Sequence, residues 1–132
     1  MKGKPELLCV SRDALLNLTR RLILEKCFEV RLADSEEEAI ALLAGQSFAL
    51  VLLCYSLMDE ECRAIVEVVH GLAAPPKILF LAEGLDRRLL GPQDEEFVFG
   101  GPADLVKKAT SMAGLPLGEA EEADSGANQK LA

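Results

Sequence analysis

The sequence predicts an α/β domain: a three-layer α/β/α sandwich built on a five-stranded parallel sheet. Its most informative stretch is the apolar run Phe48–Cys54, which lies between Gly45 and the acidic pair Asp59 and Glu60. A short run of this kind is typical of a strand buried on both faces. Along the whole chain, apolar runs alternate with amphipathic stretches, as in parallel sheets covered by helices. The 132 residues, half of them hydrophobic, suffice for one domain with its own core.

The first strand and the first helix follow Pro5. Leu7–Val10 is a short apolar strand, and a helix is expected from Ala14 to Lys26, capped by Ser11 or Asp13. Three leucines recur at helical spacing and predict the buried face of this helix. These core leucines are Leu15, Leu18 and Leu22, widened by Leu16 and Ile23, and the polar residues assigned to the outer face are Asn17, Arg20, Arg21 and Glu25.

The next two elements have clear local signals. Residues 28–32 alternate apolar and charged side chains, which indicates an edge strand with one face in water. Ser35 followed by Glu36–Glu38 is a capping box that begins a helix, and Gly45 is expected to stop it. The buried strand Phe48–Cys54 comes directly afterwards.

The second half repeats the alternation less regularly. A helix is predicted from Asp59 to Gly71, and a buried strand from Lys77 to Ala82. The pattern then weakens, and residues 86–90 favour at most a short helix. A last strand is expected at Phe97–Phe99, and a last helix at Ala103–Ala113. Its inward side chains are predicted to be Leu105, Val106, Ala109 and Met112.

Composition predicts where the folded domain ends and which classes of partner are excluded. Residues 1–114 are predicted to fold, and residues 115–132, rich in Gly, Ala and Glu, are expected to be a disordered acidic tail. The net charge of −8 opposes binding to nucleic acid, which requires clustered Lys and Arg. No apolar run approaches the length of a membrane span. We therefore expect no nucleic-acid or membrane partner.

The four cysteines are Cys9, Cys27, Cys54 and Cys62, and none has the spacing of a zinc site. Three of them lie in apolar contexts, which favours buried free thiols in a reducing compartment. No signal peptide is visible. These observations predict a cytoplasmic protein.

With these elements in place, residues 5 to about 113 resemble a bacterial response-regulator receiver domain of the CheY-like type. The resemblance rests on the order and lengths of the elements and on the stretch Phe48–Asp59. It implies a flavodoxin-like sheet with strand order 2-1-3-4-5. It also implies a pocket at the carboxyl ends of the strands, where the family phosphorylates an Asp beside Mg²⁺.

At each functional position the chain departs from the family. The phosphate-accepting Asp corresponds to Cys54, and the acidic pair that holds the metal corresponds to Ser11 and Arg12. A thiol cannot form an acyl phosphate, and Mg²⁺ needs carboxylate oxygens. We therefore expect no enzyme activity, no cofactor and no metal. The degenerate pocket that the resemblance implies consists of Ser11, Arg12, Asp13, Cys54, Ala82 and Gly100.

The predicted function is that of a non-phosphorylatable pseudo-receiver, acting in signal transduction through protein–protein interaction. The resemblance implies a protein partner or a homodimer on the face formed by the fourth strand, the fifth strand and the last helix. The residues assigned to this surface are Leu89, Leu90, Phe97, Phe99 and Leu105. The alternative is a small-anion-binding or thiol-redox domain that uses a pocket between Arg12 and Cys54.

The sequence allows two interpretations for each of two predicted pocket residues, Cys54 and Arg12. Cys54 is either a reactive thiol, with its pKa lowered by Arg12, or a small buried hydrophobic residue. Arg12 is either an internal cation that replaces Mg²⁺ or an ordinary surface residue. The first role requires a carboxylate partner, for which Asp13, Asp59 and Glu83 are candidates. The single histidine, His70, is predicted to be a helix-end residue and not a catalyst.

Overall fold

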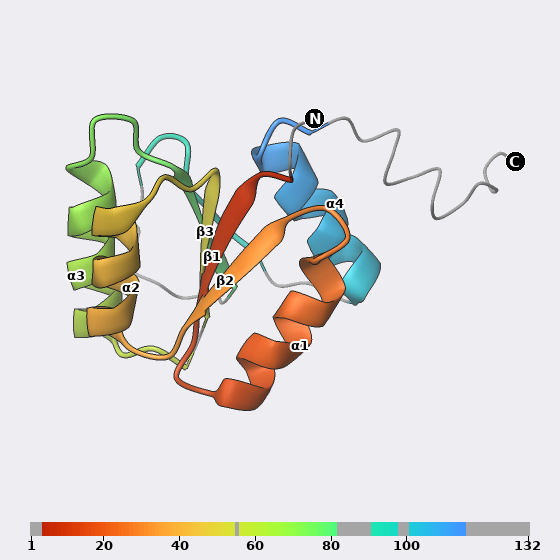
Figure 1. Ribbon diagram of the computed structural model, residues 1–132, viewed down its shortest axis with the longest axis horizontal. Coiled ribbons are helices and arrows are strands. Elements are labelled where there is room, and N and C mark those ends of the chain that lie inside the picture. The colour runs from red at the N-terminus through yellow and green to blue at the C-terminus, as the bar shows by residue number, and fades with distance from the viewer. Residues whose placement is uncertain (1–3, 55, 82–90, 98–100, 116–132) are drawn as a thin grey trace, which may run out of the picture.

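The computed structural model describes residues 4–54, 56–81, 91–97 and 101–115. In this part of the chain a five-stranded parallel sheet has the order β2-β1-β3-β4-β5 (Figure 1). The predicted fold class and strand order are therefore confirmed. The elements are β1 (Glu6–Val10), α1 (Ala14–Leu24), β2 (Glu29–Ala33), α2 (Glu36–Gly45), β3 (Leu50–Cys54), α3 (Asp59–His70), β4 (Lys77–Leu81), β5 (Glu95–Glu96) and α4 (Pro102–Met112).

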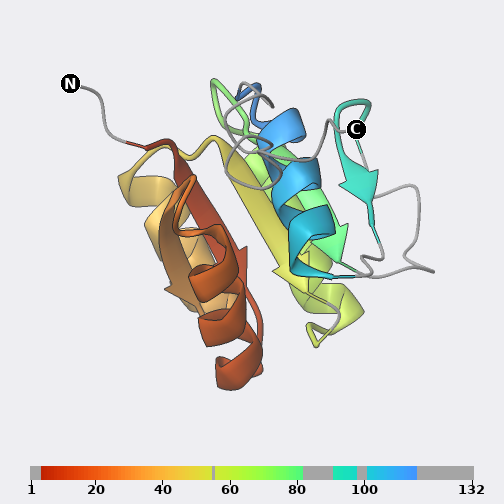
Figure 2. The same cartoon turned by 90° about the vertical axis from the view of Figure 1, so that its right-hand side faces the viewer.

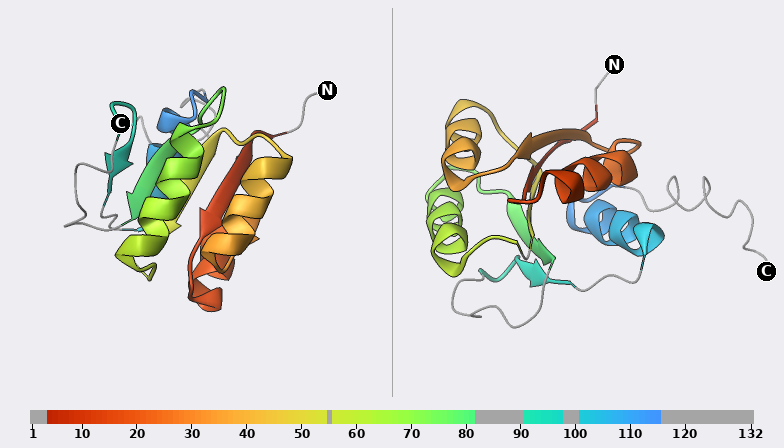
Figure 3. Two further views of the ribbon diagram at one scale, coloured as in Figure 1. Left: turned by 90° about the vertical axis from the view of Figure 1, so that its left-hand side faces the viewer. Right: turned by 90° about the horizontal axis from the view of Figure 1, so that it is seen from below.

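The helices form two layers, one on each face of the sheet. Helices α1 and α4 lie on one face, and α2 and α3 cover the other (Figures 2 and 3). Alternate residues of each central strand point to opposite faces, so each face has its own apolar cluster. Cys9, Leu52 and Cys54 belong to the cluster under α1 and α4. Val10, Leu53 and Phe80 belong to the cluster under α2 and α3.

Strands β1 and β3 form the centre of the sheet. All five residues of β3 are buried, as the apolar run predicted. The register places Cys9 beside Leu52 and Val10 beside Leu53. Because all five strands are parallel, their carboxyl ends meet along one edge of the sheet, where loops carry functional side chains in this type of fold.

The orientation of α1 is the reverse of the prediction. Asn17 and Arg20 are buried, whereas the three leucines predicted for the core are exposed. The physical reason lies at the ends of β1 and β2. The side-chain amide of Asn17 donates hydrogen bonds to the backbone oxygens of Ser11, at 3.2 Å, and Ala33, at 2.9 Å. A leucine at this position would leave both carbonyl groups without this donor.

The last strand also differs from the prediction. Strand β5 is Glu95–Glu96, which pairs with Leu79 and Phe80 of β4, so it begins two residues before the predicted strand, whose residues 98 and 99 lie outside the described part. The backbone N–H of Phe97 still donates to the oxygen of Phe80, at 2.8 Å. At the edge of the sheet, backbone pairing with β4 selects the strand, and apolar side chains are not required.

One residue of the predicted interaction surface is buried. Leu105 has no exposed area and packs in the cluster under α1 and α4, so it cannot form part of a surface. Phe97 is half-buried. Leu89, Leu90 and Phe99 lie outside the described residues, as do the expected helix at 86–90 and residues 116–132 of the expected tail. Leu115, one residue past the predicted boundary, packs against the same cluster.

The predicted starts of α2 and α3 agree with the structure. The hydroxyl of Ser35 accepts a hydrogen bond from the N–H of Glu38, at 3.1 Å, as the capping box requires. Helix α2 ends at Gly45, as expected, and Gln46 is its C-cap. None of the described helices is both long enough and apolar enough to cross a membrane.

A buried carboxylate joins α3, β4 and the segment before β5. Asp94 accepts hydrogen bonds from the backbone N–H groups of Ile78, at 2.9 Å, and Gly91, at 2.8 Å. Its second oxygen also lies 2.9 Å from Nε2 of His70, whose side chain is 37% exposed. His70 is thus a helix-end residue with a structural contact that the sequence pattern did not show.

We expect Asp94→Ala to lower the free energy of unfolding by about 2–4 kcal/mol, because the buried N–H of Ile78 loses a charged acceptor. Urea denaturation measures this change. Gln93→Ala is the matched control, since Gln93 is an exposed neighbour. Equal stability of the two variants would contradict the role given to Asp94.

Candidate functional site

Two loops at the carboxyl ends of β1 and β3 are joined by a pair of hydroxyl groups. Oγ of Ser11 lies 2.9 Å from Oγ of Ser56, and either can donate. Ser56 also accepts the backbone N–H of Arg12, at 3.0 Å, and Ser11 accepts that of Asp13, at 3.0 Å. Ser11 has no exposed area. The loop after β1 is therefore fixed to the loop after β3 by direct hydrogen bonds.

An ion pair joins the loop after β1 to the start of α3. A terminal nitrogen of Arg12 bonds to one carboxylate oxygen of Glu61, in the first turn of α3. The other oxygen of Glu61 accepts the backbone N–H of Met58, at 2.8 Å. The side chain of Glu61 is only 8% exposed, and that of Arg12 is 53% exposed. This bond to Glu61 raises the pKa of Arg12, and the bond from Arg12 lowers the pKa of Glu61.

The partner of Arg12 was not among the predicted candidates. Asp13 is the N-cap of α1 and accepts the N–H groups of Leu15, at 2.9 Å, and Leu16, at 3.2 Å. Glu83 lies outside the described residues. A sequence signal for Glu61 did exist, because a Glu at the third position of a helix reaches back to the N-cap backbone. That position leaves its second oxygen for Arg12.

Cys54 lies beneath these loops and is only 2% exposed. The neighbouring thiol of Cys9 lowers the pKa of Cys54, and the positive charge of Arg20 acts in the same direction. Contact with Cys54 and burial raise the pKa of Cys9. The cation that acts on Cys54 is therefore Arg20, on the buried face of α1, and not Arg12, which the reactive-thiol interpretation required.

The described residues at the carboxyl ends of β1 and β3 do not fit Mg²⁺. A hard cation needs several carboxylate or carbonyl oxygens. At the end of β1 the chain places Ser11 and Arg12, and the carboxylate of Asp13 caps α1. Among the described residues, no three His, Cys, Asp or Glu side chains lie close enough to hold a metal ion. Ala82 and Gly100, the other two predicted pocket residues, lie outside the described part.

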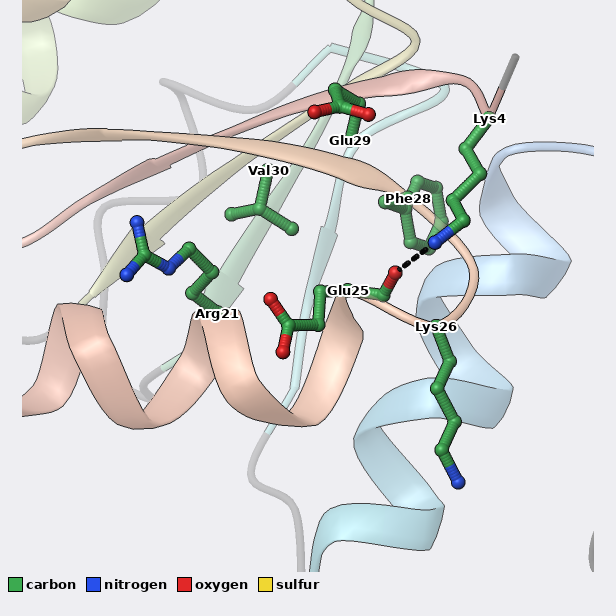
Figure 4. Close-up of a pocket in the computed structure, with 7 residues that line it drawn as sticks. All are labelled: Lys4, Arg21, Glu25, Lys26, Phe28, Glu29 and Val30. Atoms are coloured by element: carbon green, nitrogen blue, oxygen red, sulfur yellow. Dashed lines mark hydrogen bonds between the residues drawn. The ribbon is translucent and has the colours of Figure 1, made fainter.

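A groove of about 500 Å³ lies at the opposite ends of the strands, where α1 leads into β2 (Figure 4). In it, Nζ of Lys4 donates to the backbone oxygen of Glu25, at 2.6 Å. Positive and negative side chains mix here, so the groove has no single charge preference. The lining residues are Lys4, Arg21, Glu25, Lys26, Phe28, Glu29 and Val30.

The fold of this chain is similar to that of several solved structures. A response regulator from Thermotoga maritima superposes with a TM-score of 0.69 at 18% identity, over 85% of this chain and 99% of that one. The signal receiver domain of a response regulator from Bermanella marisrubri gives 0.68 at 21%, over 83% and 98%. The chain has the receiver-domain fold.

A third structure agrees with this assignment. A CheY-like receiver domain from Methylobacillus flagellatus gives a TM-score of 0.67 at 18% identity, over 83% of this chain and 99% of that one. No protein-family model and no curated protein sequence matches the chain. The receiver-domain fold is therefore shown by three-dimensional similarity. The chemistry at the strand ends follows from this chain's own residues.

The ion pair predicts a pH dependence. Because Arg12 lowers the pKa of Glu61 in the folded chain, ionised Glu61 stabilises the fold above the ordinary carboxyl pKa of about 4.3. This contribution is lost as the pH falls through the lowered folded value. Glu61→Gln is therefore expected to be less stable than the wild type at pH 7. The difference should be small, since Arg12 is half exposed, and should shrink at acid pH.

Thermal unfolding of both proteins between neutral and acid pH checks this expectation. Glu60→Gln is the matched control, because Glu60 is exposed in the same helical turn. A stability difference for Glu61→Gln that does not change with pH would contradict the ion pair.

Burial predicts the order in which the cysteines react. Cys27 is half-buried, whereas the other three cysteines are buried, and burial raises the pKa of Cys62 to about 11. Under native conditions we expect iodoacetamide to modify Cys27 first, and Cys54 no faster than Cys9. Peptide mass spectrometry measures the rates. Selective modification of Cys54 in the folded chain would establish it as a reactive thiol.

Proposed function

We propose that this chain is a non-phosphorylatable pseudo-receiver that acts in signal transduction by binding another protein. The receiver-domain fold supports the connection with two-component signalling. The observation that carries the proposal is the pair of bridges at the carboxyl ends of β1 and β3. There, Ser11 bonds to Ser56, and Arg12 bonds to Glu61.

In these bridges, the side chains of Ser11 and Arg12 bond to Ser56 and Glu61 of the same chain. Ser11 and Arg12 occupy the positions at which the resemblance implies metal-binding acids. The guanidinium of Arg12 supplies a fixed positive charge, and Glu61 neutralises it without an external ion. The hydroxyls of Ser11 and Ser56 bond to each other and to backbone N–H groups. In this proposal the bridged loops hold one conformation permanently, and the module signals by its presence and not by its phosphorylation state.

The identity of residue 54 supports the same conclusion. The resemblance implies a phosphate-accepting Asp at the end of the third strand, where this chain has Cys54. A thiol cannot provide the carboxylate oxygen of an acyl phosphate. Asp59 is a poor substitute, because it lies in the first turn of α3, five residues past the end of β3.

The partner surface is also a proposal. The resemblance implies binding through the face formed by β4, β5 and α4. In the described part of this face, Lys108 pairs with Glu95 and lies 5.8 Å from the ring centroid of Phe97. These contacts fix α4 against the edge strand. They provide an ordered surface of mixed charge, with Phe97 half-buried within it.

The alternative function is a thiol-redox or small-anion-binding domain. One observation favours it: the pKa of Cys54 is lowered, with Cys9 and Arg20 beside it. Two observations weigh against it, since Cys54 is only 2% exposed and Arg12 is bonded to Glu61. The alkylation experiment described above separates the two functions.

We expect no stable phosphorylation when the full chain is incubated with acetyl phosphate and Mg²⁺. Intact-mass spectrometry and titration with beryllofluoride are the two measurements. A receiver domain that retains its acceptor Asp, treated in parallel, is the positive control. A hydroxylamine-sensitive phosphoryl adduct on this chain would overturn the proposal, and an Asp59→Asn variant would then test whether Asp59 carries it.

A further inference from the structure

We draw no further inference here: the strongest candidate, the exposed apolar outer face of helix α1 at Leu15, Leu18 and Leu22, carries none because nothing in the structure shows what covers it.

Discussion

The bond between Arg12 and Glu61 is the interaction that organises the carboxyl-terminal edge of the sheet. It spans the carboxyl ends of the two central strands, where a parallel α/β sheet normally leaves its functional groups open to ligands. With the hydroxyl pair of Ser11 and Ser56, it turns two independent loops into one connected unit. In this site the positive charge of Arg12 is balanced by the carboxylate of Glu61.

The sheet beneath this edge explains why a buried thiol is tolerated at residue 54. Cys54 and Cys9 lie in the apolar cluster under α1 and α4, where a small sulfur-containing side chain packs as a hydrophobic residue. Arg20 adds a positive charge from the inner face of α1. The pKa of Cys54 is therefore set by groups beneath the loops, first the thiol of Cys9 on β1 and then the charge of Arg20.

Helix α1 connects this edge with the outer surface. Asn17 lies on its buried side and binds strand-end carbonyl groups, whereas Leu15, Leu18 and Leu22 are exposed. The same hydrogen bonds that order the end of β1 therefore also fix an apolar stripe in water. A helix so arranged keeps apolar area in contact with water, which costs hydrophobic free energy.

The sequence alone determined the succession of strands and helices, because a strand buried on both faces and a capped amphipathic helix have local signatures. It also determined that Cys54 ends β3 and that Arg12 follows β1. Only the tertiary structure decided that Glu61 is the partner of Arg12, that α1 turns Asn17 inward, and that β5 is Glu95–Glu96. These three outcomes depend on carbonyl, amide and charged groups brought together from distant segments, and hydrophobic periodicity carries no information about such pairings.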